Sequence, residues 1–234
     1  MKKRKFLDLV LSAFFPSRCE VCGEVIEMGR DVCDKCNNEI FPITGEVCHK
    51  CGVGLSSHSQ ERCREMTAPV IAAYYYKDTV RNLIINFKET KNKKYFERFS
   101  LAFYEKIASE YCDIDFDLAV CVPSKSEKKT TSSIICKETA KRFLIDCDIS
   151  VLEKYRQTEK QHRLNMAERF NNLENSIRVR RGKEALVKDK TILLFDDVKT
   201  TGTTLSECAK ALYNSGAKAV YSACLAVSDY STIK

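Results

Sequence analysis

The sequence predicts an α/β protein in which a parallel sheet covered by helices follows a cysteine-rich, metal-binding head. Three observations carry this prediction. Seven of the 13 cysteines fall within the first 63 of 234 residues. The apolar run at residues 191–195 is typical of a strand buried on both faces. An acidic pair, a hydroxyl-rich turn and a helical pattern follow it, as expected at the ligand-binding edge of an open parallel sheet.

Composition indicates a folded, globular chain with a basic surface. Hydrophobic residues make up 44% and charged residues 30%, with 8 Gly and 4 Pro, which excludes disorder and collagen-like repeats. The formal net charge of +7 favours an anionic partner. Because the cysteine count is odd and the pairs are spaced Cys-x-x-Cys, we expect reduced thiols and a cytoplasmic protein rather than a disulfide framework.

The first 15 residues have the outline of a signal peptide, with a basic start and an apolar run. However, Asp8 interrupts the run and no small-x-small cleavage site follows it. The spacing of Phe6, Leu9, Val10 and Phe14 predicts a short amphipathic helix instead. Since no stretch reaches the roughly 20 apolar residues needed to cross a bilayer, we expect no membrane insertion.

Two Cys-x-x-Cys pairs in the head predict a structural zinc ribbon, with the ligands Cys19, Cys22, Cys33 and Cys36. Gly23, directly after the first pair, allows the tight turn that brings backbone amides to the sulfurs. A thioredoxin-like redox pair is the alternative. It would require a βαβ setting, for which the segment has too few residues.

A second, incomplete copy of the ribbon begins at Cys48-x-x-Cys51 and continues to Cys63. We predict His58 as the fourth ligand, because the side chain of His49, inside the knuckle, would have to double back. Alternatively, the second site has been lost and its cysteines pack as small core residues. The chain is therefore expected to hold one or two zinc ions, which serve folding because closed four-ligand sites leave no open coordination position.

Hydrophobic patterns order the rest of the chain into one α/β domain. We place the head at residues 1–68 and the second domain at residues 69–234. Expected helices include residues 79–87, 95–111 and, within a longer helix, 138–144. Expected strands lie at residues 70–76, 118–122, 177–180, 191–195 and 219–227.

The acidic pair Asp196 and Asp197 comes directly before a turn that suits a phosphate group. Backbone amides, threonine hydroxyls and the positive end of the next helix form an anion site, at Thr200, Thr201, Gly202, Thr203 and Thr204. Two carboxylates beside a phosphate are explained if they serve ribose hydroxyls of the same ligand, with Mg²⁺ nearby. The alternative is that these residues only cap the helix, since Ser, Thr and Asp favour such positions.

Residues 193–204 resemble the phosphoribosyl pyrophosphate (PRPP) signature of type I phosphoribosyltransferases. Together with two Cys-x-x-Cys ribbons ahead of it, this motif resembles the ComF family, named for bacterial competence. The likeness also covers residues 14–23, 74–88, 117–123 and 161–169. The resemblance implies a type I phosphoribosyltransferase-like parallel sheet behind an N-terminal zinc-ribbon head.

The resemblance also implies roles for individual residues. Asp196 and Asp197 would hold the ribose 2′ and 3′ hydroxyls, and residues 200–204 would bind the 5′-phosphate. Ser124 and Lys125 would face the pyrophosphate, with Mg²⁺ as the accompanying cofactor. One segment departs from the family: residues 128–135 stand where the family usually has Arg-Gly-(Phe/Tyr)-Asn-Gln. PRPP binding and turnover are therefore separate expectations, and whether the protein is an enzyme stays open.

The leading hypothesis is a PRPP-binding, ComF-like protein connected with DNA uptake or processing, with other competence proteins as further candidate partners. The first alternative is a non-catalytic module that handles single-stranded DNA and keeps a relic PRPP pocket. Its motivation is the altered segment at residues 128–135. The basic charge, which is concentrated in residues 77–98, 125–142 and 153–183, is compatible with single-stranded nucleic acid and is also explained by an ordinary solvated surface. The second alternative is a metabolic phosphoribosyltransferase acting on a nucleobase.

Overall fold

The computed structural model describes residues 16–58, 60, 63, 66–90, 93–124, 130–155 and 176–228, with backbone only for residues 93–99. Several predicted features lie outside these residues. They are the N-terminal amphipathic helix, Lys125, and the family-like segment at residues 161–169. The basic stretch at residues 153–183 is described only in part.

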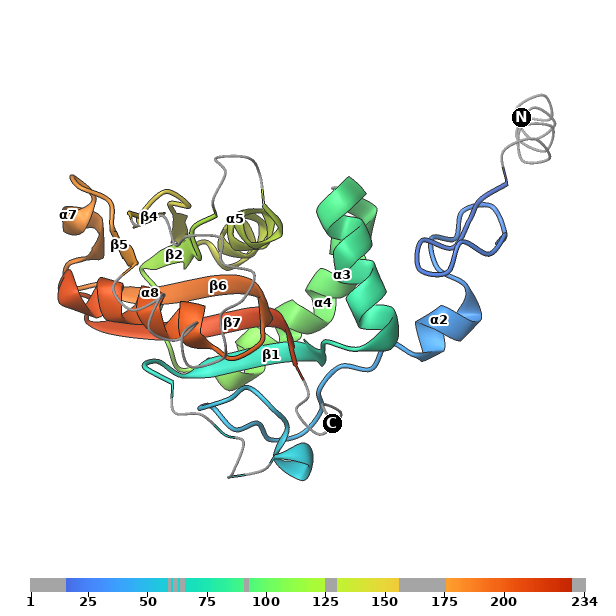
Figure 1. Cartoon of the computed structure of the whole chain (residues 1–234), viewed down its shortest axis with the longest axis horizontal. Helices are drawn as coiled ribbons and strands as arrows, with labels where there is room; N and C mark the ends of the chain where they lie inside the picture. Colours follow the sequence, from blue (N-terminus) through green and yellow to red (C-terminus); the bar gives the residue numbers. More distant parts are fainter. Residues whose placement is uncertain are drawn as a thin grey trace, which may run out of the picture.

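A five-stranded parallel sheet forms the centre of the second domain (Figure 1). Its strand order is β1-β7-β6-β2-β3. The strands are β1 (Val70–Tyr75), β2 (Leu118–Cys121), β3 (Asp146–Cys147), β6 (Thr191–Lys199) and β7 (Ala219–Val227). A separate antiparallel pair consists of β4 (Leu152–Lys154) and β5 (Ile177–Val179).

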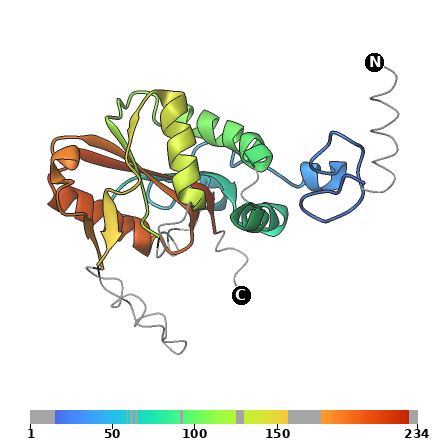
Figure 2. The same ribbon diagram turned by 90° about the horizontal axis from the view of Figure 1, so that it is seen from above.

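Helices cover both faces of the sheet (Figure 2). The helices α4 (Lys93–Glu110) and α5 (Thr131–Phe143) pack on one face, with α3 (Asp78–Thr90) beside α4. Helix α8 (Thr203–Asn214) packs on the other face, and the short α7 (Glu184–Val187) precedes β6. The units β2-α5-β3 and β6-α8-β7 run in opposite directions along the sheet. Because parallel crossovers are right-handed, the two units place their helices on opposite faces.

The central strands are apolar on both faces, as a sheet covered on both sides requires. Residues Ile192, Leu193, Leu194 and Phe195 of β6 are fully buried, and Ala223 to Val227 of β7 are at most 3% exposed. The helices bury one stripe each: in α8 these side chains are Leu205, Cys208, Ala209, Ala211 and Leu212. Burial of this apolar area is the main force that holds the layers together.

Most predicted elements are present, with three differences. Strand β6 continues through Asp196 to Lys199, because β7 offers it a paired neighbour along that length. The predicted strand near residue 177 joins β4 in the small antiparallel sheet rather than the main sheet. Helix α5 begins at Thr131, where Thr130 and Ser133 form a reciprocal capping box.

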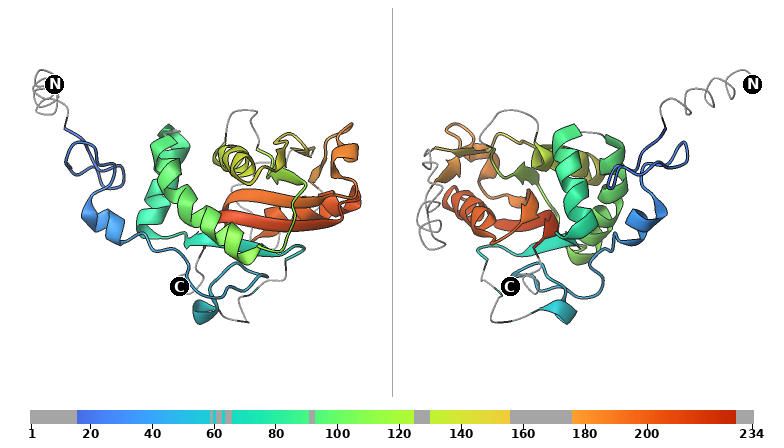
Figure 3. Two further views of the ribbon diagram at one scale, coloured as in Figure 1. Left: turned by 180° about the vertical axis from the view of Figure 1, so that it is seen from behind. Right: turned by 45° about the vertical axis from the view of Figure 1, so that its right-hand side comes forward.

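The second ribbon packs directly against the main sheet. Val70 N donates to His49 O at 2.7 Å and Ile43 N donates to Ala73 O at 2.7 Å, so this ribbon lies along β1 (Figure 3). Ile43, Val47, Cys51 and Val53 belong to the same hydrophobic core as the strands. The first ribbon, which contains α2 (Asp34–Asn38), has a small core of its own around its cysteines.

Within the described part of the chain, no helix combines the length and the apolar character that crossing a membrane would require.

Candidate metal centres and ligand site

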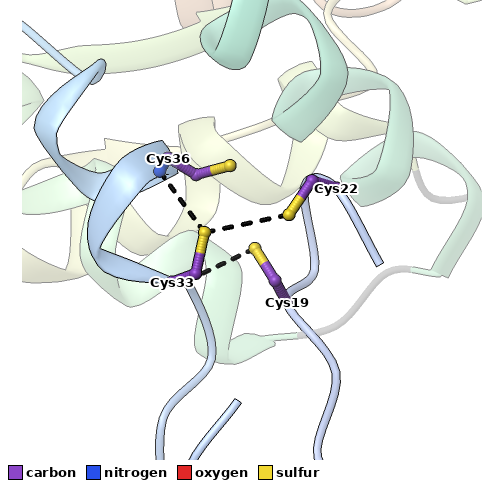
Figure 4. A group of neighbouring side chains, drawn as sticks. All are labelled: Cys19, Cys22, Cys33 and Cys36. Atoms are coloured by element: carbon purple, nitrogen blue, oxygen red, sulfur yellow. Dashed lines mark hydrogen bonds between the residues drawn. The ribbon is translucent and has the colours of Figure 1, made fainter. Parts of the chain in front are cut away.

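The first ribbon gathers four sulfur atoms that all lie within 4.8 Å of one another. Cys33 N donates to Cys19 Sγ at 3.3 Å, and Cys36 N donates to Cys33 Sγ at 3.4 Å. In Figure 4 the thiols of Cys19, Cys22, Cys33 and Cys36 surround a common centre. Gly23 has φ +75° and donates to Cys19 O at 2.8 Å, which is the turn predicted after the first pair.

The protonation chemistry of this cluster suits a thiophilic cation. Burial acts to raise the pKa of Cys19, but backbone amides of Cys22, Cys33 and Val21 outweigh it and lower the pKa to about 6. Burial raises the pKa of Cys36. A metal ion binds cysteine as the thiolate, so a cation bound to this cluster would displace the remaining thiol protons. Four convergent cysteines in this spacing fit a tetrahedral structural zinc site.

The second ribbon brings Cys48, Cys51, Cys63 and His58 together, with their ligand atoms again within 4.8 Å of one another. His58 Nε2 is buried and makes no hydrogen bond with the residues that the structure describes. A buried ring nitrogen without a partner is costly unless it binds something, so this atom fits a metal ligand. His49 instead points its Nε2 to Glu110 Oε2 at 3.1 Å. The choice of His58 over His49 thus agrees with the placement of both side chains.

The candidate ligand site lies at the carboxyl ends of β2 and β6. Strand β2 ends opposite Phe195, and Val122 N donates to Phe195 O at 2.9 Å. Beyond Phe195, β6 pairs with β7 alone in this sheet, so Asp196 and Asp197 have no strand neighbour on the β2 side. In the strand order, the connection after β2 leads to β3 on one side, whereas the connection after β6 leads to β7 on the other side. Such a reversal of direction is where open parallel sheets bind their ligands.

The two carboxylates of the site have different surroundings. Asp196 Oδ1 accepts hydrogen bonds from Ser132 Oγ at 3.3 Å and from Asp197 N at 2.8 Å. Although Asp196 retains some exposed surface, desolvation of its carboxyl group, together with the neighbouring Asp197 carboxylate, raises its pKa well above the ordinary value. Without a ligand, ionisation of the Asp196 carboxyl group is therefore unfavourable. A carboxyl group with such a perturbed pKa is a candidate for contact with a polar ligand.

Lys88 is a site residue that sequence reasoning did not single out. It lies in the last turn of α3, and its Nζ is 2.5 Å from Asp197 Oδ2. The Lys88 side chain is 44% exposed, while that of Asp197 is 17% exposed. In the sequence, Lys88 stands out only as the last residue of the family-like segment at residues 74–88. Its ion pair with Asp197 depends on how α3 packs at the sheet edge, which the sequence does not show.

The hydroxyl-rich loop forms the turn between β6 and α8. Gly202 has φ +83° and is the N-cap of α8, so the cap position carries no side chain. Thr201 Oγ1 lies 3.0 Å from Thr203 Oγ1 and accepts from Thr203 N at 3.4 Å. These contacts are weaker than a side-chain cap, which argues against capping as the full explanation of the threonines. The first turn of α8, with the positive end of the helix, follows this loop directly.

The second ribbon reaches this loop through its last residues. A Cβ atom on Gly202 would lie 2.5 Å from Met66 Sδ, so Met66 covers the loop at that point. Ser206 Oγ lies 3.6 Å from Met66 Sδ and accepts from Thr67 N at 3.4 Å. Lys199 is 3% exposed, and burial lowers its pKa while the thiols of Cys224 and of the second ribbon act in the opposite direction.

The loop after β2 is described only at its start and its end. Ser124 is exposed, and Lys125 lies outside the described residues. In the segment that departs from the family, Thr131, Ser132 and Ser133 are buried at the start of α5. The Ser133 hydroxyl belongs to the capping box with Thr130, and Ser132 Oγ donates to Asp196 Oδ1. Thr131 Oγ1 is buried and makes no hydrogen bond with the described residues.

Solved structures that are similar to this chain include a PRPP amidotransferase and a purine phosphoribosyltransferase. The glutamine PRPP amidotransferase from B. subtilis complexed with ADP and GMP is 21% identical, with a TM-score of 0.36 over 52% of this chain and 25% of that one. The purine phosphoribosyltransferase from Pyrococcus horikoshii Ot3 is 20% identical, with a TM-score of 0.37 over 59% of this chain and 77% of that one.

Curated relatives cover a smaller part of the chain. The DNA utilization protein YhgH of Escherichia coli (strain K12) is 33% identical over 94 residues, which are 40% of each chain. The protein of the same name from Salmonella typhi is also 33% identical over 94 residues. The match thus spans less than half the length of these relatives.

Family models match both parts of the chain. The double zinc ribbon domain matches residues 10–67, which include all seven head cysteines. The phosphoribosyl transferase domain matches residues 109–232, more than half of the chain, and this range contains the acidic pair and the hydroxyl-rich loop. The chain therefore belongs to the phosphoribosyl transferase domain family, and the double zinc ribbon ahead of that domain makes it ComF-like.

Proposed function

We propose that the protein binds PRPP together with Mg²⁺ at the carboxyl ends of β2 and β6. The observation that carries the proposal is the succession, at one sheet edge, of two carboxylates and a threonine-rich loop that opens α8. A ligand that matches it needs vicinal hydroxyls and a phosphate monoester on the same sugar. The described residues 196–204 provide groups for both parts.

Asp196 and Asp197 are proposed to accept hydrogen bonds from the ribose 2′ and 3′ hydroxyls. Both residues lie beyond the point where β6 loses its pairing with β2, so no strand lies beside them on that side. Ribose hydroxyls would supply donors to Asp196, whose ionised form is poorly stabilised without a ligand.

The turn of Thr200, Thr201, Gly202, Thr203 and Thr204 is proposed to bind the 5′-phosphate. The amides and hydroxyls of a loop at a helix N-terminus are matched to a dianionic group. Ser124, and Lys125 in the same loop, are proposed to lie toward the pyrophosphate, at the end of the neighbouring strand β2. Mg²⁺, when bound, would supply positive charge against the pyrophosphate oxygens. Mg²⁺ prefers oxygen ligands, which the carboxylates at this sheet edge and the phosphate oxygens of PRPP would provide.

Titration calorimetry with PRPP tests this proposal. We expect a saturable heat in the presence of Mg²⁺ that the double variant Asp196→Asn, Asp197→Asn removes. Ribose 5-phosphate and pyrophosphate are the component controls, and each alone should bind more weakly than PRPP. An unchanged heat in the double variant would mean that PRPP binds elsewhere, or through its phosphates alone.

We further propose that PRPP binding serves a cytoplasmic protein that acts in DNA uptake or processing. Support comes from the similarity to proteins named for DNA utilization and from the ComF-like domain order. A part of the basic surface is paired, since Arg178 Nε and Nη2 each lie 2.9 Å from Glu153 Oε1. The cations left for a polyanion would thus come mainly from other parts of residues 77–98, 125–142 and 153–183.

Binding of single-stranded DNA across a salt series separates this proposal from a purely metabolic one. Contacts to several phosphates should weaken binding steeply as salt increases. Undetectable binding at low salt would leave other competence proteins as the route to DNA. A nucleobase phosphoribosyltransferase is the second candidate, because the family match covers a transferase domain. It predicts release of pyrophosphate when the protein is mixed with PRPP, Mg²⁺ and a suitable base.

A further inference from the structure

Three cysteines outside the ribbons lie together behind the ligand site. Cys121 ends β2, Cys136 lies in α5 and Cys147 lies in β3, so the β2-α5-β3 unit brings them to one place. Cys136 Sγ is 3.6 Å from Cys147 Sγ. Cys121 Sγ lies 3.8 Å from Ile149 O. Among the described residues, the compact ligand groups suited to a metal are those of the two ribbons, so these thiols form a cluster of a different kind.

The two closest thiols differ in access to solvent. Cys136 is fully buried, whereas Cys147 is exposed on β3, the edge strand of the sheet. A reagent in solution therefore reaches Cys147 first and finds Cys136 directly behind it. An exposed thiol with a buried neighbour within van der Waals distance is the arrangement of an attacking and a resolving cysteine.

The electrostatic surroundings assign the same order. The hydrogen bond from Cys136 lowers the pKa of Cys147, burial opposes this effect, and the positive charge of Lys137 supports it. Hydrogen bonding to Cys121 and Cys147, together with burial, raises the pKa of Cys136. Thiolate reactivity follows these differences, so the nucleophile is Cys147 and the proton remains on Cys136.

We propose that Cys147 and Cys136 form a reversible oxidation site whose substrate is a hydroperoxide. The Cys147 thiolate attacks the outer peroxide oxygen and the O–O bond breaks. The products are a sulfenic acid at Cys147 and a hydroxide or alkoxide, which takes a proton from solvent and leaves as water or an alcohol. The Cys136 sulfur then attacks the Cys147 sulfur, and the sulfenic hydroxyl leaves as water with the Cys136 proton. The pair loses two electrons to the peroxide, and a small dithiol returns them.

The position of Cys136 connects this chemistry to the ligand site. Ser132 and Cys136 are four residues apart in α5, so they lie on one face of the helix, and Ser132 contacts Asp196. A disulfide has an S–S length of about 2.05 Å, so the two sulfurs must approach by about 1.5 Å. We expect this shift of α5 or β3 to lower PRPP affinity about threefold or more, a consequence that rests on the proposed function.

Peptide mapping tests the oxidation site without reference to PRPP. The zinc-loaded full chain is treated with stoichiometric hydrogen peroxide, alkylated, and digested with trypsin without reduction. Residues 130–137 and 143–154 are tryptic peptides with one cysteine each, so a linked pair identifies the Cys136–Cys147 disulfide without ambiguity. The pair should disappear after dithiol treatment, and a chromophoric chelator should detect no zinc release at this dose.

Three variants define the outcome. Cys136→Ser should stop the reaction at a sulfenic acid on Cys147, trapped by a 1,3-diketone probe, while Cys147→Ser should show neither product. Cys112→Ser, which removes another exposed thiol, should keep the linked pair. Absence of the linked pair in the wild type, or alkylation of Cys147 no faster than that of Cys112, would overturn the proposal. A disulfide that forms without changing PRPP binding would overturn only the connection to the ligand site.

Discussion

Lys88 Nζ lies 2.5 Å from Asp197 Oδ2, which places a cation from α3 on a carboxylate of the candidate ligand site. The acidic pair lies on β6 at the sheet edge, whereas the Lys88 cation belongs to α3, which begins at Asp78, more than 100 residues earlier in the chain. Without ligand, Lys88 neutralises Asp197. If an anionic ligand binds beside Asp197, as proposed, we expect the Lys88 ammonium group to contact ligand oxygens.

We predict that Lys88→Gln weakens PRPP binding about three- to tenfold, the range expected when a partly exposed charge-assisted contact is lost. Lys190→Gln is the matched control. Lys190 pairs with Asp117 Oδ1 at 3.2 Å before the start of β6, at the opposite end of the sheet, and is 45% exposed. Calorimetry at one salt concentration compares the two variants. Equal losses in both would point to overall charge instead of a contact made by Lys88.

Asp196→Asn is predicted to stabilise the ligand-free protein while it impairs PRPP binding. The pKa of Asp196 in the folded state is raised above its unfolded value of about 3.9. As pH rises from about 4 through the raised pKa, the wild type therefore loses stability, because ionisation is easier in the unfolded chain. The Asn variant lacks this loss.

Thermal unfolding between pH 4 and pH 8 measures this difference. A gain of 1 kcal/mol corresponds to a Tm increase of about 2–4 °C for a chain of this size. The variant should also show no Tm increase when PRPP and Mg²⁺ are added. A variant less stable than the wild type throughout the pH range would contradict the unfavourable burial of the Asp196 carboxylate.

Gly202→Ala is predicted to destabilise the protein and the phosphate loop together. The φ of +83° costs a residue with a Cβ roughly 1–2 kcal/mol, and the new methyl group would lie 2.5 Å from Met66 Sδ. Adding Met66→Ala should remove the contact but not the backbone strain, so we expect partial recovery. Chemical denaturation of both single variants and the double variant gives the coupling. Strictly additive effects would show that Met66 does not press on the loop.

Loss of the second zinc site is predicted to weaken PRPP binding, whereas loss of the first is not. Met66 and Thr67, three and four residues after Cys63, contact Gly202 and Ser206 of the loop and α8. We expect two zinc ions per wild-type chain and one in either Cys63→Ser or Cys22→Ser. Elemental analysis gives the zinc content and calorimetry the affinity. If Cys22→Ser has the larger effect on PRPP, the second ribbon does not support the loop.

Much of the fold could be predicted because hydrophobic pattern and residue spacing are local properties. The strand at residues 219–227 has the predicted bounds, since a run buried on both faces is continuously apolar. The spacing of the head cysteines likewise identified both clusters, including His58, because a tetrahedral site constrains the loop between its ligands. The boundary at residue 68 remains a prediction, although the second ribbon shares the core of the sheet.

Other expectations needed the tertiary structure. The spacing of the cysteines outside the ribbons gives no sign of a pair, but the β2-α5-β3 unit brings Cys136 to Cys147. The sequence of residues 128–135 shows only a departure from the family pattern. In the structure this segment begins α5, and its Ser132 Oγ donates a hydrogen bond to Asp196 Oδ1. Neither contact leaves a periodic signal, because each depends on how a helix crosses from one strand to the next.

The sequence by itself indicated the two chemistries proposed for this protein: thiolate clusters for zinc, and carboxylates with a hydroxyl-rich turn for a phosphorylated sugar. Residue type and short spacing suffice for both, since each set of groups lies within a few turns of chain. Only the tertiary structure decided that Lys88 meets Asp197 and that Met66 covers Gly202. These pairs are set by the strand order β1-β7-β6-β2-β3 and by the hand of the crossovers, which bring distant segments to one sheet edge.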